Sequence, residues 1–271
     1  MFFKLLSIEA AKLYSRLMTW VELILFSGMA GGAYLLLNVL RPGRSGLLLP
    51  DAINHSYLFS MVLGSSLGGL FFVVLVGAFV AQEYTWGTYS LLLSRGVRRS
   101  ELLLAKLLVL LPFAILIVIL PFVVSGLVSA IFTYKAQGSL VALGQVNWVL
   151  FLEMIGMATL SLLPYGALAF LLAALTHSPV VAIGITGGFS LIVENILIRM
   201  LALFGNPYAL IIPYLPAGMV YGLISGTGII PSDGMSLLAP FPAALGLGIY
   251  TLLFLGIAMW FFQRQDLGSG S

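Results

Sequence analysis

Residues 57–82 read YLFSMVLGSSLGGLFFVVLVGAFVAQ, a stretch without a single charged side chain. A helix of roughly 20 apolar residues crosses a hydrocarbon core about 30 Å thick, so this stretch is long enough to span a membrane. Similar stretches recur along the chain, of which 61% is hydrophobic and only 8% is charged. Soluble domains contain about 45–50% apolar and about 25% charged residues. The sequence therefore predicts an integral membrane protein.

The apolar stretches predict an all-α fold with six membrane-spanning helices. We expect them at residues 19–40, 57–82, 102–133, 147–175, 179–203 and 242–262. So many spans leave no room for a separate soluble domain, and residues 1–267 are interpreted as a single transmembrane domain. Residues 268–271 are interpreted as an expression linker. The net charge of +3 is too small to indicate a nucleic-acid partner, and the absence of cysteine excludes disulfides and thiolate metal sites.

Residues 1–18 have a different pattern from the spans. Apolar side chains recur at spacings of three and four from Phe3 to Leu17, whereas Lys4, Lys12 and Arg16 fall on the opposite side. This pattern is typical of an amphipathic helix that lies along the membrane interface with its basic face in water. The alternative is that the segment is only the polar beginning of the first span.

The distribution of lysine and arginine predicts the orientation in the membrane. Basic residues are enriched in cytoplasmic loops, and an orientation with both termini in the cytoplasm places eight of them inside and four outside. The inner set is Lys4, Lys12, Arg16, Arg95, Arg98, Arg99, Lys106 and Arg264, and the outer set is Arg41, Arg44, Lys135 and Arg199. We therefore expect a multi-pass protein of the cell inner (cytoplasmic) membrane with both termini cytoplasmic.

The outer segment 204–241 contains five prolines between apolar pieces that are too short to span the membrane. Proline interrupts each helix that could form there. A re-entrant hairpin before the last span, packed on the other helices, would satisfy the backbone hydrogen bonds. The alternative is a broken additional span, which would place the two termini on opposite sides.

Charged residues concentrate between the second and third spans. Residues 82–106 read QEYTWGTYSLLLSRGVRRSELLLAK and hold six charges. Thr88 can cap a short helix here, and Gly87 permits the turn before it. The exposed charges would form charge-assisted contacts with a partner; they are Arg95, Arg98, Arg99 and Glu101. The alternative is an ordinary basic loop that reflects only the topology rule.

The order of these residues resembles the first cytoplasmic loop of ABC-2 type transporter permeases. In that family an acidic residue ends the second span, and a Gly-Thr pair, a leucine-rich short helix, basic residues and a lysine follow. The matching residues are Glu83, Gly87, Thr88, Leu91 to Leu93, Arg95, Arg98, Arg99 and Lys106. Gly96 stands where a proline is common, and Ala105 where a glycine often precedes the lysine. The six spans, the N-terminal helix and the long outer segment extend the resemblance over the chain.

The resemblance implies the membrane subunit of a type V ABC exporter. It implies two ABC ATPase subunits that carry ATP and Mg and dock on residues 83–101. It also implies a dimer with a second permease copy or a related permease. The residues implied to couple the ATPase are Glu83, Gly87, Thr88, Arg95, Arg98, Arg99, Glu101 and Lys106. The chain has no Walker A sequence, so we expect ATP hydrolysis on the partner and no cofactor, metal or catalytic residue here.

Small and polar residues of the second and fifth spans are candidates for a transport pathway or a dimer interface. Glu194 is costly inside a membrane, by about 2.5–3.5 kcal/mol. It is expected either to serve the pathway or to form an internal pair with Asn195 or Arg199. Close helix packing is predicted by the small-residue spacing of two glycine pairs. The candidates are Gly64, Ser65, Ser66, Gly68, Gly69, Gly184, Gly188, Glu194 and Asn195.

A mostly apolar lining favours an amphipathic or lipid-like substrate. Two other functions stay open: a self-contained channel or ion-coupled carrier that uses Glu194, and a membrane scaffold that transmits a mechanical signal. Glu22 and Glu153 are expected near span ends, with their carboxylates solvated.

Overall fold

The computed structural model describes residues 2–40, 52–85, 98–137, 147–205, 208–225 and 237–264. Within these ranges every regular element is helical, and six segments are long and apolar enough to cross a membrane. The chain is therefore an all-α, multi-pass membrane protein. Gly87, Thr88 and Arg95 of the predicted coupling loop lie outside the described residues.

The six spans agree with the predicted ranges to within a few residues. They are α2 (Leu17–Leu40), the second span α3–η2–α4 (Ala52–Leu63, Gly64–Gly68 and Gly69–Thr85), α6 (Arg99–Gln137), α7 (Trp148–Thr176), the fifth span α8–η4–α9 (Pro179–Gly188, Phe189–Val193 and Glu194–Phe204) and α11 (Pro240–Arg264). The elements η2 and η4 are π-helical turns, so the second and fifth spans each contain a local widening of the helix.

The turn between α7 and α8 is specified by local sequence. His177 ends α7 in the left-handed conformation, with φ 56°. Ser178 then caps α8, because its side chain accepts a hydrogen bond from the amide of Val181, and Pro179 occupies the first helical turn. Proline at this position needs no hydrogen-bond partner for its nitrogen. The two spans therefore reverse direction within two residues.

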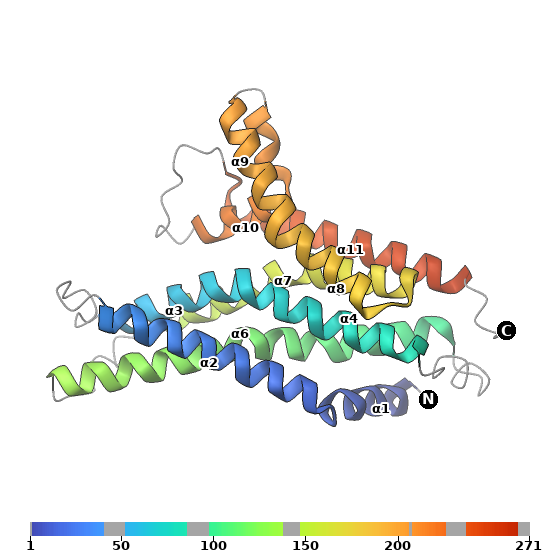
Figure 1. Ribbon diagram of the computed structural model, residues 1–271, viewed down its shortest axis with the longest axis horizontal. Helices are drawn as coiled ribbons and strands as arrows, with labels where there is room; N and C mark the ends of the chain where they lie inside the picture. Colours follow the sequence, from blue (N-terminus) through green and yellow to red (C-terminus); the bar gives the residue numbers. More distant parts are fainter. Residues whose placement is uncertain are drawn as a thin grey trace.

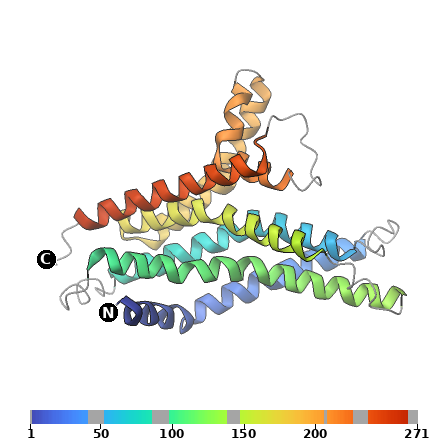
Figure 2. The ribbon, with the colours of Figure 1, turned by 180° about the vertical axis from the view of Figure 1, so that it is seen from behind.

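Five of the six spans form an elongated bundle (Figures 1 and 2). In its centre, α7 packs against both α4 and α11, while α6 packs against α2, α3 and α7. Large buried phenylalanines fill the space between the helices, among them Phe26, Phe79, Phe113, Phe122 and Phe170. Burial of such rings excludes lipid and water from the interior and fixes the relative positions of the helices.

The fifth span leaves this bundle at an angle (Figure 1). Its first part, α8, packs against α4 and α7, whereas α9 contacts η5 (Tyr208–Tyr214), a 3-10 helix. A further short helix, α10 (Pro216–Ser225), packs on α11. Neither η5 nor α10 is long enough to span a membrane, so no additional span occurs in the described part of segment 204–241. The re-entrant arrangement stays a prediction.

The N-terminal helix α1 (Phe2–Tyr14) is a separate element, because the helix breaks at Ser15 and Arg16. It packs against α6 and α2. Its predicted apolar face was partly wrong: Phe3 is 82% exposed, whereas α1 buries Leu5, Glu9 and Leu13. Glu9 can lie on the buried face of α1 because Lys12 and Lys106 balance its charge. The interfacial location of α1 stays a prediction.

Gly166 allows α7 to lie close to α4. A methyl group on Gly166 would overlap the ring of Phe72, which is itself buried. Gly156 lies on the same helix, and nothing occupies the space around its missing Cβ within 4 Å. The two glycines therefore compare a buried position in contact with Phe72 with an exposed position on the same helix.

We expect Gly166→Ala to lower the free energy of unfolding by about 1–3 kcal/mol, because the added methyl overpacks the α4–α7 contact. Gly156→Ala should leave stability unchanged or raise it slightly, since alanine is the better helix former. Thermal unfolding of both purified variants in the same detergent measures the difference. Equal melting temperatures would contradict the packing described here.

Candidate functional site

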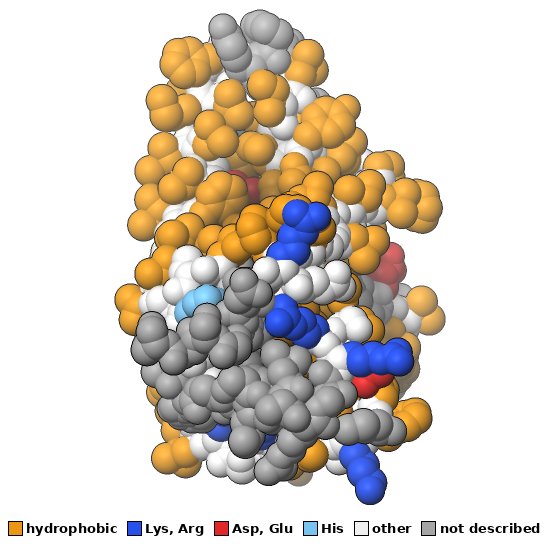
Figure 3. Space-filling view, turned by 90° about the vertical axis from the view of Figure 1, so that its right-hand side faces the viewer, with side chains coloured by type: hydrophobic (Ala, Val, Ile, Leu, Met, Phe, Trp, Pro, Cys, Tyr) orange, Lys and Arg blue, Asp and Glu red, His pale blue; other side chains and the backbone are white. Residues whose placement is uncertain are grey.

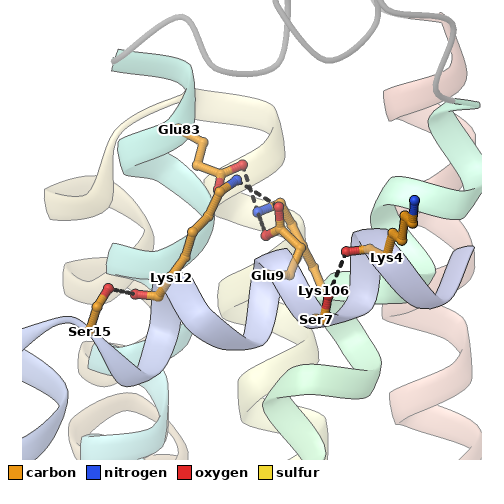
Figure 4. A network of polar contacts seen from close by, with 7 residues as sticks. All are labelled: Lys4, Ser7, Glu9, Lys12, Ser15, Glu83 and Lys106. Carbon is orange, nitrogen blue, oxygen red and sulfur yellow. Dashed lines mark hydrogen bonds and ion pairs between the residues drawn. The ribbon is translucent and has the colours of Figure 1, made fainter. Parts of the chain in front are cut away.

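Four charged side chains form a closed ring at one end of the bundle (Figure 4). Lys12 Nζ lies 2.7 Å from Glu9 Oε1 and 3.0 Å from Glu83 Oε1. Lys106 Nζ lies 2.7 Å from Glu9 Oε2 and 2.6 Å from Glu83 Oε2. The last of these contacts is an ion pair without the geometry of a hydrogen bond. Each lysine thus bridges both carboxylates, and we call Glu9, Lys12, Glu83 and Lys106 the charge ring.

The charge ring joins three helices at their ends. Glu9 and Lys12 come from α1, Glu83 from the last turn of α4, and Lys106 from the beginning of α6. The side chains of Glu9, Glu83 and Lys106 are at most 1% exposed, and that of Lys12 is 26% exposed. Burial of an ion costs several kcal/mol, which only good pairing geometry offsets. Two carboxylates and two ammonium groups that alternate provide this pairing.

Burial and pairing have opposite effects on the charged groups of α1. Burial acts to raise the pKa of Glu9, but the charges and hydrogen bonds of Lys106 and Lys12 outweigh it, so the pKa lies below the usual 4.5. Burial acts to lower the pKa of Lys12, but hydrogen bonds and charges of Glu9 and Glu83 outweigh it, so the pKa lies above the usual 10.5. Both groups are therefore charged at neutral pH.

Aromatic and polar contacts extend the charge ring. Lys106 Nζ lies 4.5 Å from the centre of the Phe79 ring, and the guanidinium of Arg16 lies 5.1 Å from the same ring. Cations are attracted to the face of an aromatic ring. Arg16 also donates a hydrogen bond of 3.0 Å to Gln82 Oε1. The end of α1 is therefore held against the end of α4 by several contacts.

The structure places the described residues of the predicted coupling set, and their role in coupling stays a prediction. Glu83 and Lys106 are buried in the charge ring, so their side chains cannot reach the surface of a partner. Arg99 donates hydrogen bonds to the carbonyls of Phe262 and Gln263, at 3.3 and 3.0 Å, at the C-terminal end of α11. Of the predicted contact residues that are described, Arg98 is exposed, while Arg99 and Glu101 are half-buried.

Basic side chains gather at this end of the molecule (Figure 3). The residues of the charge ring, the first turn of α6 and the last turn of α11 meet there. His177, at the turn between α7 and α8, stacks on Tyr84 with ring centres 4.1 Å apart. Seven of the eight basic residues predicted to be cytoplasmic are described. They lie in α1, α6 and α11 or directly beside these helices: Lys4, Lys12, Arg16, Arg98, Arg99, Lys106 and Arg264.

A second feature is a polar pocket bordered by both π-helical turns. The cavity has a volume of about 200 Å³, and its wall includes residues of the second span, α7, the fifth span and α10. Such π-helical turns occur frequently at functional sites. The polar side chains of the wall are Ser65, Ser66, Tyr165, Ser190, Asn195 and Tyr221. The structure thus brings together predicted residues of the second and fifth spans.

Glu194 lies behind this pocket and joins two parts of its wall. The carboxylate is fully buried; its Oε2 accepts a hydrogen bond of 2.7 Å from the Tyr165 hydroxyl. Its Oε1 accepts one of 2.6 Å from the amide of Ala217, in the first turn of α10. That amide has no partner within its own helix, so Glu194 caps α10 from another span. Glu194 forms neither of the predicted internal pairs, because its hydrogen bonds go to Tyr165 and Ala217 rather than to Asn195 or Arg199.

The predicted glycines fall into two groups. Alanine side chains at Gly64, Gly68 and Gly69 would meet Ala158, Phe26 and Leu162 respectively, so this part of the second span packs inside its own subunit. Gly184 and Gly188 have no neighbour within 4 Å of the added Cβ. Only the second group remains accessible to a further chain.

Sequence reasoning missed several residues of these sites. Glu9 and Lys12 were read as parts of an interfacial helix, and the i,i+3 spacing of opposite charges was the only local signal. Tyr165 and Ala217 carry no motif at all. Glu22 was expected to be solvated, but it is only 7% exposed, and neither oxygen has a hydrogen-bond partner among the described residues. Glu153 is exposed as expected.

Comparison with known families gives one clear match. Residues 23–268 match the model of a family described as "Protein of unknown function (DUF2705)". The chain belongs to this family. The DUF2705 region contains Glu83, Lys106 and the whole polar pocket, whereas α1 precedes it. The chain is also similar to "Uncharacterized protein YhcI" of Bacillus subtilis (strain 168), with 25% identity over 225 residues, which are 79% of this chain and 69% of that protein.

We expect Lys106→Met to lower the free energy of unfolding by about 3–5 kcal/mol, because it leaves two buried carboxylates with Lys12 as their one remaining partner in the ring. Lys4→Met, at an exposed position of α1, should change it by less than about 0.5 kcal/mol. Chemical unfolding of both variants in detergent measures the two effects.

The double variant Glu9→Gln/Lys106→Met removes one charge of each sign from the ring. It should lose less stability than the sum of the two single variants, because the remaining pair stays balanced. Strictly additive losses would show that Glu9 and Lys106 do not interact.

The charge ring also predicts a pH dependence. The stability that Glu9 contributes is present above its usual pKa of 4.5 and is lost as the pH falls through its lowered pKa. The stability that Lys12 contributes is present below 10.5 and is lost as the pH rises through its raised pKa. The melting temperature should therefore be flat between these limits. Glu9→Gln should reduce the fall in melting temperature at acidic pH. If this fall is unchanged in Glu9→Gln, Glu9 is not its cause.

Proposed function

We propose that this protein is the permease subunit of an ATP-driven ABC transporter of the ABC-2 type, which exports an amphipathic or lipid-like substrate. Separate ATPase subunits would supply ATP hydrolysis. The observation that carries the proposal is the charge ring, because it joins α1 to the two helix ends between which residues 86–97 run. The loop resemblance to ABC-2 permeases is the second support.

A transporter driven from outside the membrane needs a stiff connection between the ATPase and its spans. The charge ring ties α4 and α6 to α1, so a displacement applied between Glu83 and Arg98 would move both spans together. Arg99 would carry part of this displacement to α11 through its hydrogen bonds to the last carbonyls of that helix. In this mechanism Glu83 and Lys106 are positioning residues, and the exposed Arg98 is a candidate contact.

The polar pocket is the proposed substrate pathway. It lies beside η2, which directly precedes α4, so movement of α4 would change the shape of the pocket. A second permease copy would face the exposed apolar side chains of the fifth span, which include Val180, Ile192 and Leu203. We propose a dimer, with the same chain or a related permease, above two ATPase subunits.

The proposed orientation has both termini and the charge ring on the cytoplasmic side of the inner membrane. The support is the gathering of basic residues at this end, whereas Lys135 belongs to the last turn of α6 at the other end. The positive-inside rule favours this orientation.

A carrier that uses Glu194 as its ion site is a weaker proposal. Both oxygens of Glu194 accept hydrogen bonds from the protein, and the residue lies behind the pocket wall. An ion would have to break the cap of α10 to reach it. A scaffold that transmits mechanical signals would use the same charge ring, and the absence of transport in a reconstituted complex would favour it.

We expect the double variant Arg95→Glu/Arg98→Glu to lose most of its association with the proposed ATPase partner. One charge-assisted hydrogen bond contributes about 1.5–3 kcal/mol, so losing even one weakens association by roughly tenfold or more. Lys135→Glu reverses one basic charge at the other end of α6 and should have no effect. Co-purification in mild detergent gives the readout.

Two outcomes would contradict the proposal. One is that no ATPase co-purifies with the unaltered chain. The other is that the loop variant and Lys135→Glu lose the ATPase equally, because a site at residues 95–98 must distinguish them.

A further inference from the structure

The hydrogen-bond donors of the polar pocket are directed into the protein rather than into the cavity. Three serines donate to carbonyls of their own helix: Ser65 to Met61 at 2.8 Å, Ser66 to Val62 at 2.8 Å and Ser190 to Gly187 at 3.2 Å. A serine hydroxyl has one donor and two acceptor lone pairs. Each of these hydroxyls has therefore used its only donor and keeps acceptor capacity.

The remaining polar side chains of the wall are in the same state. Tyr165 donates to Glu194, and Tyr221 donates to Asn195 Oδ1 at 3.3 Å. The amide nitrogen of Asn195 donates to the carbonyls of Ser190 and Leu191, at 3.1 and 3.2 Å, in the π-helical turn η4. The described wall thus presents oxygen lone pairs, and a bound group must supply the hydrogens.

The charges around the pocket also favour a cationic ligand. The described wall contains no Lys, Arg, Asp or Glu, and the carboxylate of Glu194 is hydrogen-bonded to two residues of the wall, Tyr165 and Ala217. A negative group behind acceptor oxygens attracts a cation and repels an anion. Apolar residues such as Val62, Val220 and Ile224 complete the wall, and they suit an attached hydrocarbon chain.

We infer that the polar pocket binds the ammonium headgroup of an amphiphile, one that carries N–H donors and is followed by an apolar tail. The cavity of about 200 Å³ has room for such a headgroup but not for a long tail, which would continue along the exposed apolar surface. Phosphate and carboxylate headgroups present only acceptors to the pocket at neutral pH and are excluded. As a substrate class this inference rests on the proposed function, but the binding preference stands by itself.

The test uses three probes with the same tail and different heads. The full chain in phosphatidylcholine nanodiscs is titrated with dodecylammonium, dodecyltrimethylammonium and dodecyl phosphate, and empty nanodiscs give the background. Dodecylammonium should bind saturably and at least roughly tenfold more tightly than the trimethyl probe, which has the charge but no N–H donor. Dodecyl phosphate should show no saturable binding. Binding of the phosphate as tight as that of dodecylammonium would overturn the inference.

Two serine variants test whether the probe binds in the polar pocket or elsewhere on the protein. Ser66→Ala removes an exposed acceptor of the wall and should weaken dodecylammonium binding roughly fivefold or more, with a smaller effect on the trimethyl probe. Ser161→Ala is the matched control, because Ser161 makes the same kind of bond, to the carbonyl of Ala158, but does not line the pocket. Equal effects of the two variants would place the probe elsewhere.

A third variant tests the acceptor argument by exchanging one acceptor for another. Tyr221→Phe removes the acceptor oxygen of Tyr221 but frees the Oδ1 of Asn195, so dodecylammonium should bind about as tightly as before. A loss comparable to that in Ser66→Ala would contradict the assignment of acceptors. Thermal unfolding of each variant verifies that it is folded.

The binding assay contains neither ATP nor an ATPase. Its outcome therefore does not depend on whether the proposed function is correct. If the chain binds ammonium selectively but captures no ATPase, the pocket inference is supported and the proposed ABC permease function is contradicted. If it captures an ATPase but shows no ammonium selectivity, the pocket inference is contradicted and the proposed function is supported.

Discussion

The fold depends on a balance of charge at one end of its bundle. Two carboxylates and two ammonium groups are withdrawn from water, and any one of them alone would be strongly unfavourable there. Because each lysine bridges both glutamates, the three helix ends that carry them must meet at one point. This requirement fixes α1 against the spans and fixes the distance between the end of α4 and the beginning of α6.

The charge ring and the polar pocket are connected through the second span. Glu83 lies at one end of α4, and η2 lies at the other, where Ser65 and Ser66 enter the pocket wall. Glu194 has a comparable role on the far side of the pocket, since it holds α7 and α10 through one hydrogen bond to each. Buried carboxylates thus join neighbouring helices at both places, and neither Glu83 nor Glu194 lines the pocket.

Much of the fold could be predicted, because the length of an apolar segment is a local property. The ranges of all six spans were predicted to within a few residues, as was the concentration of charge between the second and third. The candidate sites were predicted less well. Glu83, Lys106 and Glu194 were recognised as unusual, but their partners were not, and the face of α1 was partly misjudged because an acidic residue on a basic helix looks like a surface residue.

The sequence by itself determined that the chain is helical, crosses the membrane repeatedly and concentrates charge in one loop, since these follow from hydrophobicity and spacing. Only the tertiary structure decided which charges neutralise one another. Lys12 and Glu83 are 71 residues apart, and Glu9 and Lys106 are 97 apart. No periodic pattern records contacts over such separations, because they arise when helices pack and burial leaves each ion only the partners within reach.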